Sequence, residues 1–406
     1  MQMNLVEKSV RPQDLQLARK WVLSAITLAL LNPACALFQG DDAGGGGGGA
    51  AELVTKSYLY ASTYDAASLA AQKLLAFEVN RETGVLTFVS SVDDLSNAQN
   101  PVILNGYLYV NSRGENKIRV FKIDPETGTL TDETAASGTA VTGIYVGGEL
   151  AVDSLHGRLA IVYSAGSASG LKKVRFLQQD PLTGVLTQIG SGTDSSSGTS
   201  GIPDTLAFSG DLSQLVISTD TPHFGIGTAD LAAGTYSSAG VGGVTVGAML
   251  AYPGTNFFLV SDATYNRIET FTAPLSLGGA STQLLNSAYA YFMVKHPSLD
   301  VIYAAGSVMG ISAYSFNATS GALTALNKAG GTTPISAPDA DEGLAVLSNG
   351  SFAFASHGVS VTPARIDIYP LDATAGSFGE GSTQADLSVA LPSGYPRFLI
   401  TADFEI

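Results

Sequence analysis

Hydrophobic and polar residues alternate over short stretches of this chain, and turn-forming residues separate the stretches. Residues 120–123 (V-F-K-I) alternate as a half-buried strand does, and residues 129–131 (T-L-T) open a second strand. Between them, residues 124–128 (D-P-E-T-G) supply turn chemistry, because Asp bonds its own backbone, Pro fixes φ and Gly accepts a positive φ. The pattern predicts an antiparallel hairpin over residues 120–131.

The same hairpin pattern recurs along the chain. Clear copies of the turn occupy residues 80–87, 180–187 and 317–324, and weaker copies occupy residues 230–236 and 372–378. Apolar second strands are predicted at 58–61, 107–110, 159–163, 215–218, 257–260, 301–304 and 351–355. Repeats of about 40–55 residues with four strands each are typical of a propeller. We therefore predict an all-β fold, a seven-bladed β-propeller over residues 56–406, with no long helix after residue 52.

The two ends of the repeat region complement each other. The first repeat has no opening strand of its own, and residues 395–406 are left over after the seventh repeat. We expect residues 397–402 to complete blade one, because a C-terminal strand placed there closes the ring and removes two sheet edges.

Residues 1–35 have the organisation of a secretory signal peptide. A weakly basic start precedes an apolar run over residues 21–31, which is too short to cross a bilayer as a helix. Cys35 resembles the acylated cysteine of a bacterial lipoprotein lipobox, and residues 36–55, with six consecutive glycines, are expected to be a flexible linker. We expect an extracytoplasmic lipoprotein anchored to the membrane through Cys35. Cleavage by ordinary signal peptidase, giving a secreted or periplasmic protein, is the alternative.

Charge and cysteine content narrow the class of protein. The formal net charge of −15 and the lack of a Lys/Arg run argue against a nucleic-acid partner. Cys35 is the only cysteine, so the chain forms neither an internal disulfide nor a metal–thiolate cluster. We expect a monomer with no metal and no cofactor.

Several motifs together point to a family. Besides the repeated turn, these are Asn100-Pro101, residues 152–159 (V-D-S-L-H-G-R-L), residues 295–300 (K-H-P-S-L-D) and Pro396-Arg397. Over residues 56–406 the chain resembles the bacterial β-propeller lactonases, which include 6-phosphogluconolactonases of the cycloisomerase type. The resemblance implies a propeller that hydrolyses lactones. The family's junction histidines are absent here, however, from residues 141–146, 202–204, 289–292 and 339–342.

Candidate site residues come from loops that share one face of a propeller. Lactone hydrolysis needs a base to activate water and donors for the oxyanion, so the catalytic candidates are Asp204, His223, His357 and Arg397. The binding candidates, on loops within blades or connections between them, are Arg113, Asp262, Tyr265, Arg267, Asp341 and Glu342. His156 and His296 are expected in turns on the opposite face, in structural roles.

The sequence is compatible with two functions. The retained repeat and the lost histidines favour a lactonase-like propeller that is a binding module at the cell envelope, for a small lactone, a carbohydrate or an envelope protein. The alternative is a metal-independent lactone hydrolase, a carboxylic ester hydrolase of the 6-phosphogluconolactonase type. Convergence of a histidine, a carboxylate and Arg397 around one pocket would favour the enzyme.

Overall fold

The structure of the protein is a computed structural model. It describes residues 54–64, 72–145, 147–164, 171–190, 195–200, 203–208, 214–219, 223–230, 235–242, 246–272, 276–277, 282–283, 290–306, 310–327, 340–357, 365–379, 382–386 and 395–406. No helix among these residues is long and apolar enough to cross a membrane.

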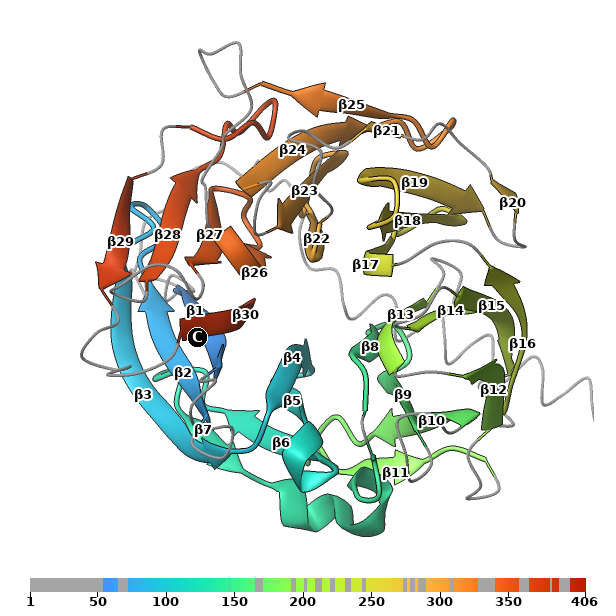
Figure 1. Cartoon of the computed structure of the whole chain (residues 1–406). Coiled ribbons are helices and arrows are strands. Elements are labelled where there is room, and N and C mark those ends of the chain that lie inside the picture. The colour runs from blue at the N-terminus through green and yellow to red at the C-terminus, as the bar shows by residue number, and fades with distance from the viewer. Residues whose placement is uncertain are drawn as a thin grey trace, which may run out of the picture. The chain divides into compact units, whose positions relative to one another are not determined.

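The described strands are joined by hydrogen bonds into seven antiparallel sheets around a central axis (Figure 1). We number them as blades and list their strands from the axis outward. Blade 1 contains β30 (Tyr395–Glu405), β1 (Thr55–Tyr64), β2 (Gln72–Val79) and β3 (Leu86–Leu95). Blade 2 contains β4 (Ala98–Leu104), β5 (Tyr107–Ser112), β6 (Lys117–Ile123) and β7 (Leu130–Asp132). Blade 3 contains β8 (Leu150–Asp153), β9 (Arg158–Ser164), β10 (Leu171–Gln179) and β11 (Leu186–Gln188), with β12 (Ser195–Ser200) also paired to β10.

The remaining blades repeat this order. Blade 4 contains β13 (Pro203–Phe208), β14 (Gln214–Thr219), β15 (His223–Asp230) and β16 (Thr235–Gly242). Blade 5 contains β17 (Val246–Ala251), β18 (Phe257–Asp262), β19 (Arg267–Thr272), β20 (Ser276–Leu277) and β21 (Thr282–Gln283). Blade 6 contains β22 (Phe292–Lys295), β23 (Val301–Gly306), β24 (Gly310–Phe316) and β25 (Leu323–Leu326). Blade 7 contains β26 (Ala340–Val346), β27 (Phe352–His357), β28 (Arg365–Pro370) and β29 (Ser382–Asp386).

The predicted all-β propeller is confirmed. Helical structure among the described residues is limited to two 3₁₀ segments, η1 (Arg113–Glu115) and η2 (Thr134–Val141). The predicted hairpin over residues 120–131 is formed by β6 and β7, which pair through Ile123 and Leu130.

The turn of this hairpin is held as its sequence predicts. The Asp124 carboxylate accepts hydrogen bonds from the backbone N–H groups of Glu126 and Thr127, both at 2.9 Å. Gly128 adopts φ +73° and donates its N–H to the Asp124 carbonyl at 2.8 Å. A side chain is strained at this φ, so glycine completes the turn.

The same turn also joins neighbouring blades. A tyrosine hydroxyl on the second strand of one blade donates to the carbonyl of the turn glycine in the next blade. The pairs are Tyr60 to Gly128 (3.0 Å), Tyr109 to Gly184 (2.9 Å) and Tyr303 to Gly376 (2.7 Å). The contact is close, because a Cβ placed on Gly128 would lie 2.3 Å from Cδ1 of Tyr58. The repeated motif therefore shapes the hairpin and fastens it to its neighbour.

The hydrophobic core lies between blades, because inner strands such as β5 bury both of their faces. Ile118 and Val120 of β6 pack against blade 3, whereas Phe121, one residue further along, packs against Tyr58 and Leu74 of blade 1. Period-two alternation sends successive side chains to opposite faces of the sheet. Each blade is therefore stabilised mainly by its two neighbours.

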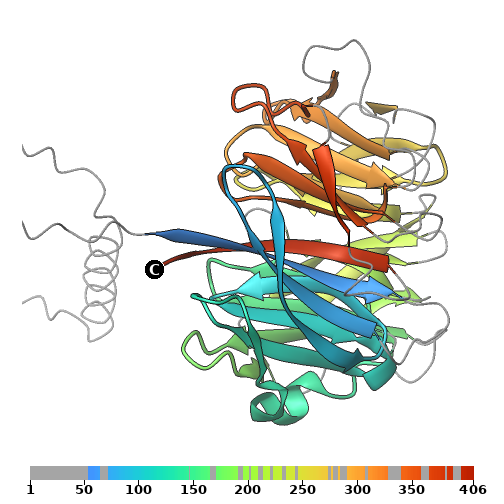
Figure 2. The ribbon, with the colours of Figure 1, turned by 90° about the vertical axis from the view of Figure 1, so that its left-hand side faces the viewer.

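The C-terminal strand closes the ring. β30 pairs with β1 from Thr55–Glu405 to Tyr64–Tyr395, and the two strands run side by side in Figure 2. The segment predicted to complete blade one, residues 397–402, lies within β30. An ion pair of 2.9 Å from Arg81 to Asp403 adds to the closure.

Candidate functional site

Irregular pairing recurs near the start of the innermost strands, where they approach one end of the central channel. In β30, Ser62 pairs with Phe398 and Thr63 with Pro396, which leaves Arg397 as the extra residue of a bulge. In β4 the register shifts between Gln99 and Val102, and Asn100 within the shift adopts φ +37°. Bulges re-aim side chains and are common beside functional sites. Here they direct residues of several blades toward the axis.

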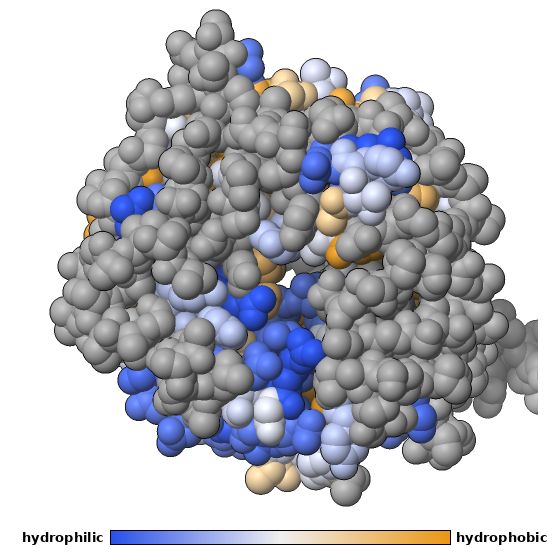
Figure 3. Space-filling model, in the orientation of Figure 1, coloured by the Kyte–Doolittle hydropathy of each residue, from blue (hydrophilic) through white to orange (hydrophobic). Residues whose placement is uncertain are grey.

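These residues line a polar cavity of about 110 Å³, which we call the mouth pocket. Figure 3 shows hydrophilic surface below the central opening on this side of the ring, and some hydrophobic surface at its upper edge. The described residues that line the pocket come from blades 1, 2, 3, 5 and 6: Gln99, Asn100, Arg113, Glu149, Gly247, Tyr291, Phe292, Arg397 and Phe398. Arg113 and Arg397, two of the candidates predicted from the sequence, therefore meet in one cavity.

The two arginines reach the mouth pocket from different elements. Arg113 begins η1, directly after β5, and its Nη1 donates to Oε1 of Gln99 at 3.2 Å. The guanidinium carbon of Arg397 lies 5.1 Å from the ring centroid of Tyr64 and 5.0 Å from that of Phe398. Such cation–π contacts hold the guanidinium over an aromatic face at the edge of the cavity.

Glu149 is a pocket residue that the sequence reasoning missed. It precedes β8, lines the mouth pocket, and its Oε2 accepts a 2.5 Å hydrogen bond from the Thr205 hydroxyl of β13. Glu149 stands directly before the innermost strand β8, on a connection between blades like the candidates Asp204, Asp341 and Glu342. This shared position is the signal in the sequence that could have identified it.

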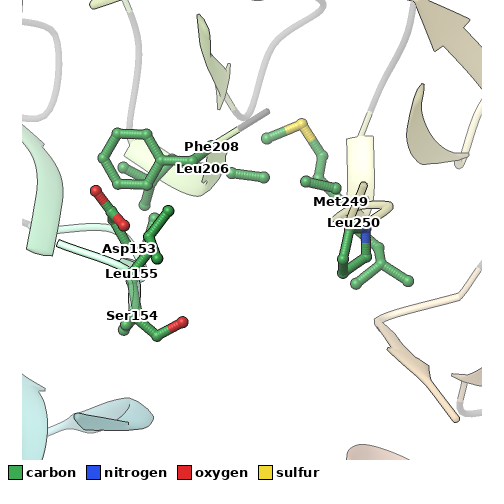
Figure 4. Close-up of a pocket in the computed structure, with 12 residues that line it drawn as sticks. Asp153, Ser154, Leu155, Leu206, Phe208, Met249 and Leu250 are labelled. Carbon is green, nitrogen blue, oxygen red and sulfur yellow. The ribbon is translucent and has the colours of Figure 1, made fainter. Parts of the chain in front are cut away.

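Two further cavities adjoin the mouth pocket along the axis. A waist of about 160 Å³ has mostly apolar walls. It shares with the mouth pocket the residues Asn100, Glu149, Tyr291, Phe292 and Phe398. A lower chamber of about 350 Å³ shares Met249 with the waist. Figure 4 shows this chamber between Leu206, Phe208, Met249 and Asp153, with side chains from β8, β13 and β17 around it.

His357 belongs to a separate cluster in blade 7. It ends β27 with 1% of its surface exposed, and its Nε2 lies against Oδ2 of Asp367. The other carboxylate oxygen of Asp367 is 3.1 Å from Nε of Arg365. His357 thus has a carboxylate and an arginine beside it, but this arginine is not Arg397, and His357 is not among the described residues of the mouth pocket.

Asp262, Tyr265 and Arg267 form another cluster in blade 5. Arg267 lies 3.6 Å from Oδ2 of the buried Asp262, contacts the Glu269 carboxylate, and stacks 4.6 Å from the ring centroid of Tyr265. The pKa of Glu269 is raised above its ordinary value, because its burial, together with the nearby Asp262, outweighs the opposite effect of Arg267. The three predicted residues do lie together, but outside the described lining of the mouth pocket.

The other predicted site residues are placed only by their backbone, or lie outside the described residues. Asp204 lies in β13, where the pairing shifts register between Pro203 and Leu206. Asp341 and Glu342 lie in a similar shift of β26, between Ala340 and Leu344. His223 begins β15. The side chains of these four residues, and Cys35 entirely, fall outside the description.

Two histidines take structural positions. The imidazole of His156 lies 2.9 Å from the carboxylate of Asp153. His296 is 2% exposed, and its Nδ1 accepts the backbone N–H of Leu299 at 3.0 Å, while Nε2 lies 3.3 Å from the carbonyl of Gly350 in blade 7. Burial lowers the pKa of His296.

Among the described side chains, no group of three or more His, Cys, Asp or Glu residues is arranged to hold a metal ion.

Solved structures with the same architecture were found at low sequence identity. A candidate 6-phosphogluconolactonase from Bacteroides fragilis is 12% identical, with a TM-score of 0.61 over 86% of this chain and 98% of that one. One from Bacteroides uniformis is 14% identical, with a TM-score of 0.60 over 86% and 99%. Apo AztD from Citrobacter koseri is 12% identical, with a TM-score of 0.54 over 86% and 99%. At these identities the likeness establishes the propeller fold alone.

No family model and no curated protein matches the sequence.

Proposed function

We propose that the protein is a binding module that takes a small organic anion into its mouth pocket. The observation that carries this proposal is the meeting of Arg113 and Arg397 in one cavity. The chain as a whole has a net charge of −15, yet the described charged residues of this pocket are two arginines and one glutamate. Guanidinium groups form strong, directional hydrogen bonds with carboxylates and phosphates.

The chemical class of the ligand is suggested by the remaining polar groups. Gln99, Asn100 and Tyr291 add amide and phenol groups to the pocket wall, and these can hydrogen-bond hydroxyl or ester oxygens. The sequence resemblance to propeller lactonases and the fold shared with the Bacteroides proteins support a sugar acid or its lactone. An envelope protein remains the other partner considered from the sequence.

Titration calorimetry with gluconate, 6-phosphogluconate and gluconolactone tests this proposal. Arg113→Gln and Arg397→Gln should each weaken binding of the acids about tenfold or more, because each removes a charge-assisted hydrogen bond. Arg158→Gln is the matched control, since Arg158 bonds Gln178 in blade 3 and is not among the described residues of the pocket. If none of the three compounds binds, a sugar acid or its lactone is excluded as the ligand, and equal effects in all three variants would refute the anion site.

Lactone hydrolysis is a second candidate, favoured by the position of Glu149 beside the two arginines. In this reaction the Glu149 carboxylate takes a proton from water, and the resulting hydroxide attacks the lactone carbonyl. A guanidinium stabilises the oxyanion, the ring C–O bond breaks, and the proton passes to the leaving oxygen. Asp204 and the histidines were the bases predicted from the sequence. Turnover that is lost in Glu149→Gln but kept in Asp204→Ala would assign the base to Glu149, and the reverse would assign it to Asp204.

We further propose that the protein is exported and carries a diacylglyceryl group on Cys35, with residues 36–55 as the linker to the propeller. The basic start, the apolar run and the glycine run support this arrangement. Mass spectrometry of the mature N-terminus tests it. A lipid-modified Cys35 is the expected result, whereas an unmodified mature chain would indicate a secreted or periplasmic protein.

A further inference from the structure

The walls of the channel change character with depth. The mouth pocket combines charged and amide side chains with the aromatic rings of Tyr291, Phe292 and Phe398. Below Asn100 and Glu149 the waist is lined mainly by apolar residues, including Val102, Leu150, Met249 and Leu344. Met249 also borders the lower chamber, whose wall includes Leu206 and Phe208. A ligand seated between the arginines therefore has an apolar cavity directly beneath it.

An apolar waist is unexpected in a channel that opens to water through a polar mouth. Concave apolar surface with a few convergent polar groups is the usual form of a small-molecule site. A fully hydroxylated ligand would satisfy the mouth pocket only and would leave its polar groups unpaired against the waist, which is costly. An apolar group placed there gains from leaving water instead.

We infer that the preferred ligand is an amphiphilic organic anion. Its carboxylate or phosphate lies between Arg113 and Arg397, and its hydrocarbon part extends into the waist toward Val102 and Met249. This inference rests on the proposed binding function and specifies it further. The arginines at the mouth select a negatively charged group on the ligand, and the apolar residues beneath them select its hydrocarbon part.

Calorimetry on the full-length protein with the straight-chain carboxylates from acetate to octanoate, and with gluconate, tests the inference. Each methylene that enters the waist should raise the affinity up to about fourfold, until the chain fills the cavity. Hexanoate should therefore bind more tightly than gluconate, which has the same number of carbons but carries hydroxyl groups.

Two kinds of variant distinguish the contribution of the ligand's carboxylate from that of its hydrocarbon part. Arg397→Gln should lower the affinity for every carboxylate by the same factor. Val102→Thr replaces a half-buried waist residue with a polar one of similar shape, so it should reduce the gain per methylene. Val85→Thr is its control, because Val85 is 54% exposed in the turn before β3.

The outcomes are distinguishable. Gluconate binding that equals or exceeds hexanoate binding would overturn the amphiphile while leaving the proposed anion site intact. Failure of every acid to bind would overturn both. Hexanol binding as tightly as hexanoate would show that the arginines do not select the ligand, and would also overturn the inference.

Discussion

The contact between the turn glycine of one blade and an aromatic ring of the preceding blade can be tested by adding a single methyl group. In Gly128→Ala the new Cβ would lie 2.3 Å from Cδ1 and 2.4 Å from Cε1 of Tyr58. These distances are too short for carbon atoms, so the ring or the turn must move. The Tyr58 ring is fully buried, and its hydroxyl donates to the Pro125 carbonyl at 3.2 Å, so the ring cannot swing freely.

Two costs add in this variant. Placing a side chain at φ +73° costs about 1–2 kcal/mol. Forcing an extra carbon into a filled interface costs roughly 1–3 kcal/mol more. The expected loss of about 2–5 kcal/mol is a large part of the 5–15 kcal/mol by which proteins are typically stable.

Gly106→Ala separates the two costs. Gly106 has φ +77°, almost the same backbone conformation, but nothing lies within 4 Å of its added Cβ. Urea unfolding followed by far-ultraviolet circular dichroism should show Gly128→Ala to be less stable than Gly106→Ala by about 1–3 kcal/mol. Tyr58→Ala should remove most of that difference in a double-mutant cycle. Equal destabilisation by the two glycine substitutions would refute the idea that the turn is wedged against its neighbour.

Three further predictions concern contacts between blades and the closure of blade 1. Tyr109→Phe removes a buried hydroxyl that donates to Gly184 and accepts from Gln179, so urea unfolding should show a loss of about 1–3 kcal/mol; an unchanged midpoint would contradict this. The pKa of His296 is lowered in the folded protein, so the unfolded chain binds a proton more readily and stability should fall as the pH drops below about 6.5. His296→Asn should reduce this dependence in thermal melts between pH 7 and 5, and an unaltered pH profile would count against the reasoning. Deleting residues 395–406 removes the innermost strand of blade 1, so calorimetry should show no cooperative transition near the melting temperature of the intact chain. A melt like that of the intact chain would argue against closure by β30.

The fold could be predicted from the sequence because its signals are local. Alternation over residues 120–123 and the D-P-E-T-G turn specify one hairpin, and the repeat extends the prediction to the rest of the ring. The place of the C-terminal strand in blade 1 could be predicted because the first repeat has no opening strand and residues 395–406 are left over after the seventh repeat. That Gly128 also contacts Tyr58 was not predictable, because the turn signal says nothing about the neighbouring blade.

The site was predictable only in part. Arg113 and Arg397 were identified because loops within blades and connections between them share one face of a propeller, and both line the mouth pocket. Glu149 was missed, and His357 lies in a cluster with Asp367 instead. The bulge at Arg397 sets which residues face the axis, and the alternation within one short strand does not reveal where such an extra residue stands.

The pairing of β1 with β30 also determines where the propeller can be attached to anything else. Val54 and Ile406 exchange backbone hydrogen bonds of 3.1 and 3.0 Å, while Tyr64, ten residues further along, lies beside Arg397 at the mouth pocket. Ten strand residues span about 33 Å. Residues 54 and 406 of the propeller therefore lie together on the side remote from the arginines, so a fusion partner joined at Ile406 would be attached away from the entrance to the channel.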